Sequence, residues 1–151
     1  MAQATTLSPQ AVTTAAKAMI ESYNDRDWDR VRATITPDFV YDEVATSRKV
    51  TGADATIEAF KGWARAFPDS KGTIQGIHIA GSGAAVVEVT WNGTHRGPLD
   101  TPNGSIAASG KPIEVRACVV LELKGEKVRV QRHYFDMVTL LQQIGAMAGG
   151  E

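Results

Sequence analysis

Three residues able to hold or move a proton stand near the end of the predicted sheet: His95, Tyr134 and Asp136. In the stretch 131–145 a charged, aromatic, strand-like run ends at Asp136, and an apolar helix-like run follows at once. A carboxylate partly removed from water has a raised pKa and can exchange a proton with a carbon next to a carbonyl group. Histidine and tyrosine side chains can hydrogen-bond the enolate oxygen that forms in such a reaction. These residue types therefore raise the question whether Asp136 is the acid or base of an active site or only a helix cap.

Two of these residues also have purely structural interpretations. Asp136 directly precedes the helix-like run, so it can cap that helix, an interaction worth ~1 kcal/mol. This role is compatible with catalysis. His95 can equally be a core histidine or lie exposed at a strand end. The residue types alone leave these alternatives open.

The elements that must position these side chains are predicted from hydrophobic periodicity. Ser8-Pro9 starts a helix over 9–23, and two more helices are expected over 28–35 and from Thr51-Gly52 to Phe67. A strand is expected over 38–44, hairpins over 71–96 and 111–136, and a short last helix ending at Gly145. Helices segregated from a run of antiparallel strands predict an α+β fold in one domain, 1–151, with a curved sheet around the helices.

The predicted strand register decides which side chains face inward. A two-residue turn at Lys124-Gly125 pairs Leu121 with Val128 and places the apolar rows of both strands on one face. Continuing this register turns Arg132, Tyr134 and Asp136 inward, whereas a bulge would shift part of the row by one residue. The predicted pocket lining is Trp63, Phe67, Trp91, Val115, Arg132 and Leu140.

The opposite face of the sheet mixes polar and apolar side chains, which is unusual for a fully solvated surface. Its predicted members are Arg116, Cys118, Val120, Arg129, Gln131, His133 and Phe135. We expect this outer sheet face to be a subunit interface of a homodimer or higher homo-oligomer. Cys118 has no local base or helix N-terminus beside it, so a reactive thiol is not expected.

Composition narrows the classes of function. The net charge of −1 does not favour nucleic acid or an anionic membrane as a partner, and no apolar run is long enough to cross a bilayer. The N-terminal stretch lacks the basic start and apolar block of a secretory signal, and a single cysteine suits a reducing compartment, so a cytoplasmic location is expected. No metal-ligand spacing and no nucleotide-binding motif occurs, so neither a metal nor a cofactor is expected.

Over nearly its whole length, the chain resembles the SnoaL-like polyketide cyclase group of the nuclear-transport-factor-2-like superfamily. The residues that carry the resemblance are Gly93-Thr94-His95 with Gly97-Pro98-Leu99, Ser109-Gly110-Lys111, Gly125-Glu126-Lys127-Val128, Tyr134 with Asp136, and Leu140 to Gly145. The resemblance implies a cone-shaped α+β barrel, a strongly bent antiparallel or mixed sheet closed by the N-terminal helices around a deep apolar pocket. In the characterised cyclases an aspartate near the end of the last strand is the general acid or base, and Asp136 matches it. A histidine common on the preceding strand of those cyclases is replaced here by Cys118.

The expected function is therefore cofactor-independent chemistry on a small hydrophobic carbonyl compound, as in a polyketide cyclase, isomerase or lyase. His95 and Tyr134 would hydrogen-bond the enolate oxygen. The alternative is a non-catalytic module of the same fold that binds a hydrophobic ligand or assembles through its sheet. An epoxide hydrolase or dehydratase is a third option, and it would need a second inward acid or histidine near Asp136.

Overall fold

The helices begin and end close to where the capping residues predict. In the computed structural model, which describes residues 7–147, the Ser8 side chain accepts a hydrogen bond from the amide of Ala11, and Pro9 is the first helical residue. Asp27 caps the second helix in the same way through the amide of Arg30. The helices are α1 (Pro9–Asn24), α2 (Trp28–Thr34), α3 (Ala53–Ala66) and α4 (Met137–Gln143), with a 3₁₀ turn, η1, at Val44–Thr46.

The strands form one six-stranded sheet and one small hairpin. The large sheet has the order β2-β1-β8-β7-β4-β3, in which only the β1–β8 pair is parallel. Its strands are β1 (Ile35–Glu43), β2 (Arg48–Thr51), β3 (Lys71–Ala80), β4 (Ala84–Thr94), β7 (Pro112–Lys124) and β8 (Lys127–Phe135). β5 (Leu99–Thr101) and β6 (Gly104–Ile106) form a separate two-stranded hairpin within the loop 97–110. The predicted α+β fold is confirmed, whereas β2 and the small hairpin were not expected. The predicted domain range 1–151 extends beyond the described residues and stays a prediction.

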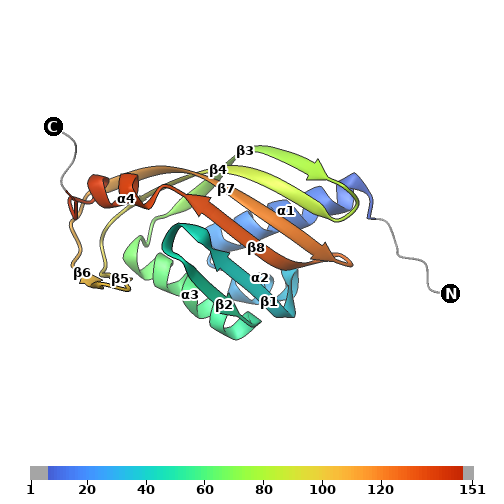
Figure 1. Ribbon diagram of the computed structural model, residues 1–151, viewed down its shortest axis with the longest axis horizontal. Coiled ribbons are helices and arrows are strands. Elements are labelled where there is room, and N and C mark those ends of the chain that lie inside the picture. The colour runs from blue at the N-terminus through green and yellow to red at the C-terminus, as the bar shows by residue number, and fades with distance from the viewer. Residues whose placement is uncertain (1–6, 148–151) are drawn as a thin grey trace.

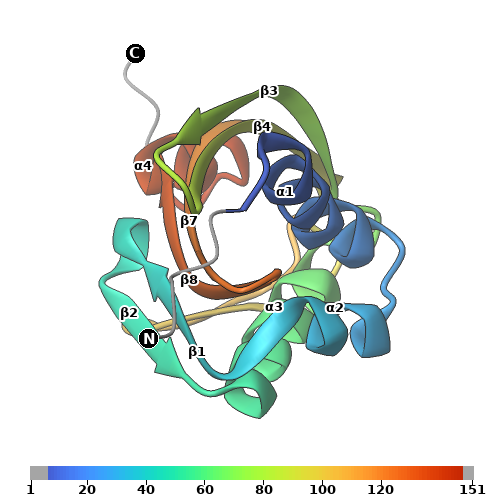
Figure 2. The ribbon, with the colours of Figure 1, turned by 90° about the vertical axis from the view of Figure 1, so that its right-hand side faces the viewer.

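The sheet curls so strongly that it encloses space on one side. Seen end-on, β3, β4, β7, β8 and β1 follow an arc, and α1, α2 and α3 lie across its open side (Figure 2). Figure 1 shows α4 and the β5–β6 hairpin at the same end of the molecule, where the long strands β4 and β7 project beyond the helices. This end is where the sheet alone cannot close the interior.

Two apolar clusters fill the interior. The larger one joins α1, α2 and α3 to the concave face of the sheet, with Phe39, Tyr41 and Val87 almost completely buried. The smaller one joins the end of α3, the β5 strand and α4, at the end of the molecule where the β5–β6 hairpin lies. Its buried members are Ala66, Phe67, Leu99, Ile113, Val115, Leu140 and Ile144. The two clusters meet around the cavity described below.

A bulge in β8 reverses which side chains face the interior. The turn between β7 and β8 is Gly125-Glu126, one residue later than predicted, and this shift alone changes the pairing by two residues and preserves the faces. Leu123 then pairs with Val128, but Glu122 pairs with Val130, so Arg129 is an extra residue. Beyond Arg129 every side chain of β8 therefore points to the face opposite to the predicted one.

The predicted inward row of β8 is consequently wrong. Gln131 and His133 are buried on the concave face, and Tyr134 is exposed on the outer face. On that outer face Cys118 pairs with Tyr134, and Val120 pairs with Arg132. The outer row thus contains Arg132 and Tyr134 in place of Gln131, His133 and Phe135. Assembly through this outer sheet face stays a prediction.

The close approach of β3 to β4 gives a test of packing beside the cavity. A Cβ at Gly72 would lie 2.8 Å from Cζ3 of Trp91 and 2.9 Å from Cγ1 of Val89. We expect Gly72→Ala to lower the free energy of unfolding by about 1–3 kcal/mol, because the partly buried indole of Trp91 must move. The matched control is Gly76→Ala in the same strand, where the nearest atoms are the ends of the Glu88 and His78 side chains. Urea unfolding checks both variants, and equal stability changes would contradict the packing argument.

Candidate functional site

A cavity lies between the two apolar clusters, under the concave face of the sheet. Its volume is about 80 Å³, small beside the roughly 300–1,000 Å³ typical of sites for drug-sized ligands. Its wall is mostly aliphatic and aromatic, and polar atoms enter it at a few places only. The lining residues are Met19, Ile20, Tyr23, Tyr41, Phe60, Trp63, Ser70, Trp91, Ile113, Val115, Gln131, His133, Phe135 and Leu140.

A buried carboxylate stands behind this wall. Glu43, at the end of β1, is 1% exposed, and it lies on the same side of the strand as Phe39 and Tyr41. Its oxygens accept four side-chain hydrogen bonds, from Tyr41 (2.6 Å), Thr46 (2.5 Å), Arg48 (3.0 Å) and Trp63 (2.8 Å). Burial alone would raise the pKa of Glu43, but the hydrogen bonds from Thr46, Tyr41 and Arg48 outweigh it and lower the pKa. Glu43 is therefore a carboxylate at neutral pH.

The parallel pairing of β1 with β8 brings His133 beside this carboxylate. Glu43 is the register partner of His133, and Tyr41 is the partner of Gln131. The Tyr41 hydroxyl lies 3.0 Å from Nδ1 of His133, and the indole Nε1 of Trp91 lies 3.3 Å from Nε2. An indole N–H only donates, so Nε2 accepts and the proton of the neutral ring lies on Nδ1. Trp91 therefore donates a hydrogen bond to His133, His133 donates one to Tyr41, and Tyr41 donates one to Glu43.

Burial also fixes the protonation states along this chain. It lowers the pKa of His133 to about 4, although the charge of Glu43 acts in the opposite direction. Burial, reinforced by the neighbouring Glu43 charge, raises the pKa of Tyr41 well above its ordinary value. At neutral pH the chain therefore holds a neutral imidazole, a protonated phenol and one negative charge. Nε2 of His133 carries the ring's lone pair, which accepts the indole N–H of Trp91, and the ring is linked through Tyr41 to a buried anion.

One polar atom near this chain has no partner. Gln131 is 6% exposed, lines the cavity next to His133 along β8, and its Oε1 accepts no hydrogen bond from the described residues. A buried amide oxygen left unpaired costs roughly 1–3 kcal/mol. A donor group of a ligand, or a water molecule, in the cavity would satisfy it.

Asp136 lies outside this arrangement. It is exposed, and its carboxylate accepts hydrogen bonds from the amide (3.1 Å) and the hydroxyl (2.7 Å) of Thr139. These bonds lower the pKa of Asp136, the opposite of the raised pKa expected for a pocket acid. The predicted cap is confirmed, and the predicted inward orientation is wrong because of the bulge at Arg129. A catalytic role for Asp136 stays a prediction.

Two other residues of the predicted site share that outward orientation. Tyr134 is 42% exposed on the outer face. The Arg132 guanidinium forms an ion pair with the Glu122 carboxylate on the same face and does not enter the cavity. Their expected inward positions are wrong for the same reason.

His95 is buried, but it faces the smaller apolar cluster. Its ring lies 5.3 Å from that of Phe67, and its Nδ1 accepts a hydrogen bond from the amide of Ser109 (3.1 Å). Burial lowers the pKa of His95. Phe67 stacks on the outer side of Trp63, with the ring centroids 6.1 Å apart. Neither His95 nor Phe67 is among the cavity-lining residues, whereas the predicted residues Trp63, Trp91, Val115 and Leu140 are.

The sequence-based prediction missed Glu43, Tyr41 and His133. The alternation in β1 placed Glu43 in one row with Phe39 and Tyr41, and a carboxylate that continues an apolar row was the available signal. His133 could not be found in this way, because its inward orientation depends on the bulge.

Within residues 7–147 no three side chains among His, Cys, Asp and Glu are placed to hold a metal ion. None of the helices in the same range is long and apolar enough to cross a membrane.

Comparisons with known proteins identify relatives by sequence and by fold. A sequence model described as SnoaL-like polyketide cyclase matches residues 13–144. A SnoaL-like protein from Jannaschia sp. CCS1 superposes with a TM-score of 0.81 at 18% identity, covering 97% of this chain and 99% of that one. TsrD from Streptomyces laurentii gives 0.79 at 22% identity, with 93% and 99% covered. A protein from Catenulispora acidiphila with a ketosteroid isomerase-like fold, solved with trimethylamine, gives 0.74 at 19%, with 95% and 98% covered. No functionally curated protein matches the chain in sequence.

The hydroxyl of Tyr41 is the link whose removal can be measured without a substrate. Tyr41→Phe leaves the buried Nδ1–H of His133 without an acceptor and removes one of the hydrogen bonds that the Glu43 carboxylate accepts. We expect the free energy of unfolding to fall by about 1–3 kcal/mol. The matched control is Tyr134→Phe on the exposed face, expected within about 0.5 kcal/mol of the parent protein. Urea unfolding at pH 7 compares them, and a Tyr41→Phe variant as stable as the control would contradict the hydrogen-bond chain.

The neutral state of His133 predicts a pH dependence of stability. In the unfolded chain a histidine takes up its proton near pH 6.5, whereas folded His133 stays neutral down to about pH 4. Protons therefore favour the unfolded chain in this window, and stability should fall by roughly 3 kcal/mol as the pH drops through it. His95 contributes in the same direction, so the reference is His133→Asn, which should show a clearly smaller slope between pH 6.5 and 4.5. An unchanged slope in this variant would show that His133 does not titrate as a buried neutral imidazole.

Proposed function

The chain belongs to the SnoaL-like polyketide cyclase family, and from this premise we propose that its cavity is a cofactor-independent acid–base site for a compact carbonyl compound. The observation that carries the proposal is the hydrogen-bonded chain from Glu43 through Tyr41 to His133, which ends at the cavity wall. His133 is the proposed base. Glu43 orients the chain and stabilises the imidazolium that forms, because all the hydrogen bonds it accepts come from protein groups and it does not itself line the cavity.

In the proposed reaction, Nε2 of His133 takes a proton from a carbon next to the substrate's carbonyl group. The electron pair of the broken C–H bond moves into the enolate, and the negative charge develops on its oxygen. When the substrate binds, the hydrogen bond donated by the indole N–H of Trp91 changes its acceptor from Nε2 of His133 to the carbonyl oxygen. This frees the lone pair of the base and stabilises the negative charge that develops on the oxygen. Return of the proton from Nε2 to a different carbon of a conjugated enolate gives isomerisation. Attack of the enolate on a second carbonyl carbon gives ring closure, and the proton on Nε2 then passes to the alkoxide oxygen that this attack forms.

The surroundings support a mostly apolar substrate of small size. Aliphatic side chains such as Ile113, Val115 and Leu140 form much of the wall, so the substrate would be removed from water together with the base. A volume of about 80 Å³ favours a compact molecule over one with several fused rings. The unpaired amide oxygen of Gln131 offers an additional hydrogen-bond acceptor on the cavity wall.

Proton transfer can be tested without knowledge of the natural substrate. The probe is cyclohexane-1,4-dione in D₂O, whose C–H protons next to the carbonyl groups exchange when an enolate forms, as followed by proton NMR. We expect the protein to accelerate this exchange and His133→Asn to reduce the acceleration by roughly 10²–10⁴-fold, the usual contribution of a general base. Asp136→Asn is the matched control, because asparagine caps a helix about as well as aspartate, and it should keep the activity.

The opposite results have defined meanings. If Asp136→Asn abolished exchange while His133→Asn retained it, the base would be Asp136, as predicted from the sequence. If the dione bound to the cavity and no exchange above the uncatalysed rate occurred, the protein would be a non-catalytic binding module. Either result would reject the proposed role of His133.

A further inference from the structure

A second polar position lies on the cavity wall away from His133. Tyr23 of α1 and Ser70, just before β3, both line the cavity and are 7% and 6% exposed. Their hydroxyl oxygens are 2.8 Å apart. The ring of Trp91 separates this pair from the base, since it packs edge-on against Tyr23 at 5.4 Å and against His133 at 6.1 Å, measured between ring centroids.

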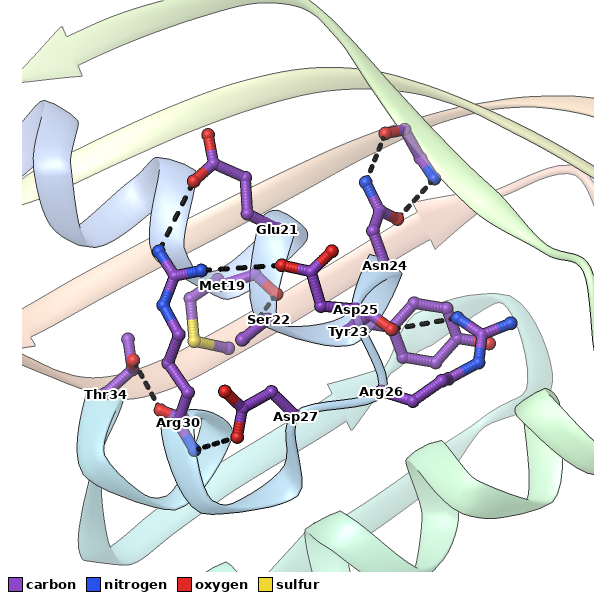
Figure 3. A network of polar contacts seen from close by, with 11 residues as sticks. Met19, Glu21, Ser22, Tyr23, Asn24, Asp25, Arg26, Asp27, Arg30 and Thr34 are labelled. Atoms are coloured by element: carbon purple, nitrogen blue, oxygen red, sulfur yellow. Dashed lines mark hydrogen bonds and ion pairs between the residues drawn. The ribbon is translucent and has the colours of Figure 1, made fainter.

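Arg26 holds this pair from behind. Its guanidinium donates to Ser70 Oγ (3.2 Å), to the carbonyl oxygen of Pro68 (2.8 Å) and to that of Tyr23 (2.8 Å). Figure 3 shows Arg26 folded back beside the Tyr23 ring, with its carbon Cζ 4.5 Å from the ring centroid. The same view shows Asn24 paired twice with the β3 backbone at Gly72, by bonds of 2.9 and 2.8 Å that fix the end of α1 against the sheet. The pair is therefore held rigidly, with a positive charge next to it.

Counting hydrogens shows what this pair offers to a ligand. Tyr23 and Ser70 carry one hydroxyl hydrogen each, and a guanidinium only donates, so Arg26 uses a lone pair of Ser70 and no hydrogen. One hydroxyl hydrogen is used in the bond between the two side chains, whichever of them donates. Neither hydroxyl has another acceptor among the described residues, so one hydrogen remains. The pair therefore presents a single hydrogen-bond donor at the cavity wall.

We infer that Tyr23 and Ser70 form a subsite for a second acceptor oxygen of the substrate, such as a ketone carbonyl, distinct from the oxygen at Trp91. The preferred substrate class is a compact, mostly apolar compound with two acceptor oxygens. One oxygen lies beside the carbon that His133 deprotonates, and the other lies at the Tyr23–Ser70 pair. The positive charge of Arg26 favours an electron-rich oxygen here and disfavours a second donor group. The inference rests on the proposed function for the position of the reacting carbon, while the oxygen subsite itself requires no reaction.

The shared hydrogen gives an unusual mutational signature. Tyr23→Phe leaves the Ser70 hydroxyl free to donate, and Ser70→Ala leaves the Tyr23 hydroxyl free, so each single variant keeps one donor. Only the double variant removes both hydrogens. Selectivity for the second oxygen should therefore survive each single substitution and disappear in the double variant.

Two matched probes measure that selectivity: cyclohexane-1,4-dione and 4-methylenecyclohexanone, in which one carbonyl oxygen is replaced by a methylene group. Binding is followed by two-dimensional ¹H–¹⁵N NMR through the indole signal of Trp91. The parent protein and both single variants should bind the dione roughly tenfold more tightly, as expected for one neutral hydrogen bond of about 1.4 kcal/mol. In the double variant the ratio should fall to about twofold or below, because only the statistical advantage of two equivalent oxygens remains and the second carbonyl is buried without a donor.

Other results would overturn the inference. Absence of selectivity in the parent protein would overturn it, as would selectivity that persists in the double variant. Loss in one single variant alone would show that one hydroxyl is the fixed donor and that the pair does not share it. If the double variant does not fold, Tyr23→Phe combined with Ser70→Cys repeats the test, because a thiol keeps the side-chain volume and is only a weak donor.

The subsite and the proposed reaction can fail separately. The same selectivity is measured in His133→Asn, where it should be retained because the pair does not depend on the base. Retained selectivity without any exchange activity would leave the subsite and reject the catalyst. Exchange activity without selectivity for the dione would reject the subsite and leave the proposed role of His133 in place.

Discussion

The charge on Glu43 is the constraint that the surrounding structure must satisfy. Leaving an ionised carboxylate unpaired in an interior would cost several kcal/mol, so its position requires donors from several directions. Those donors come from β1, η1, β2 and α3, through Tyr41, Thr46, Arg48 and Trp63. The 3₁₀ turn and the short β2 strand bring two of the donors back towards the end of β1. The 3₁₀ turn and the short β2 strand thus supply hydrogen-bond donors to one buried carboxylate.

The same charge acts on His133 through the hydroxyl group of Tyr41. Tyr41 converts the fixed anion into an oriented acceptor for Nδ1–H of His133, and this leaves Nε2 as the atom that a ligand meets. A carboxylate placed directly in the cavity would repel an enolate, whereas a neutral imidazole in front of it would not. The arrangement separates the residue that carries the charge from the residue that would move the proton.

Much of the fold could be predicted from the sequence, because the signals that define its helices and strands come from residues close together in the chain. Caps at Ser8 and Asp27 and alternation in the long strands each depend on neighbouring residues only. Trp91 was placed on the inner face correctly because β4 pairs with β7 without interruption. The candidate site could not be predicted in this way, since the position of His133 depends on a bulge at Arg129 that no turn residue or proline marks. Glu43 alternates in register with Phe39 and Tyr41, but its role was not predicted, because alternation in one strand does not show that donors from η1, β2 and α3 surround the carboxylate.

The bulge in β8 has a consequence for comparing distant relatives. A relative without the extra residue at Arg129 would carry its inward side chains at the positions occupied here by Arg132, Tyr134 and Asp136. An ungapped alignment of the two chains would then match the lining of one active-site cavity with the outer surface of the other. Evolutionary gain or loss of one strand residue could thus exchange one set of candidate catalytic residues for another while the fold stays the same. Functional residues in this strand are best transferred between homologues by superposition of the sheet, not by column in an alignment.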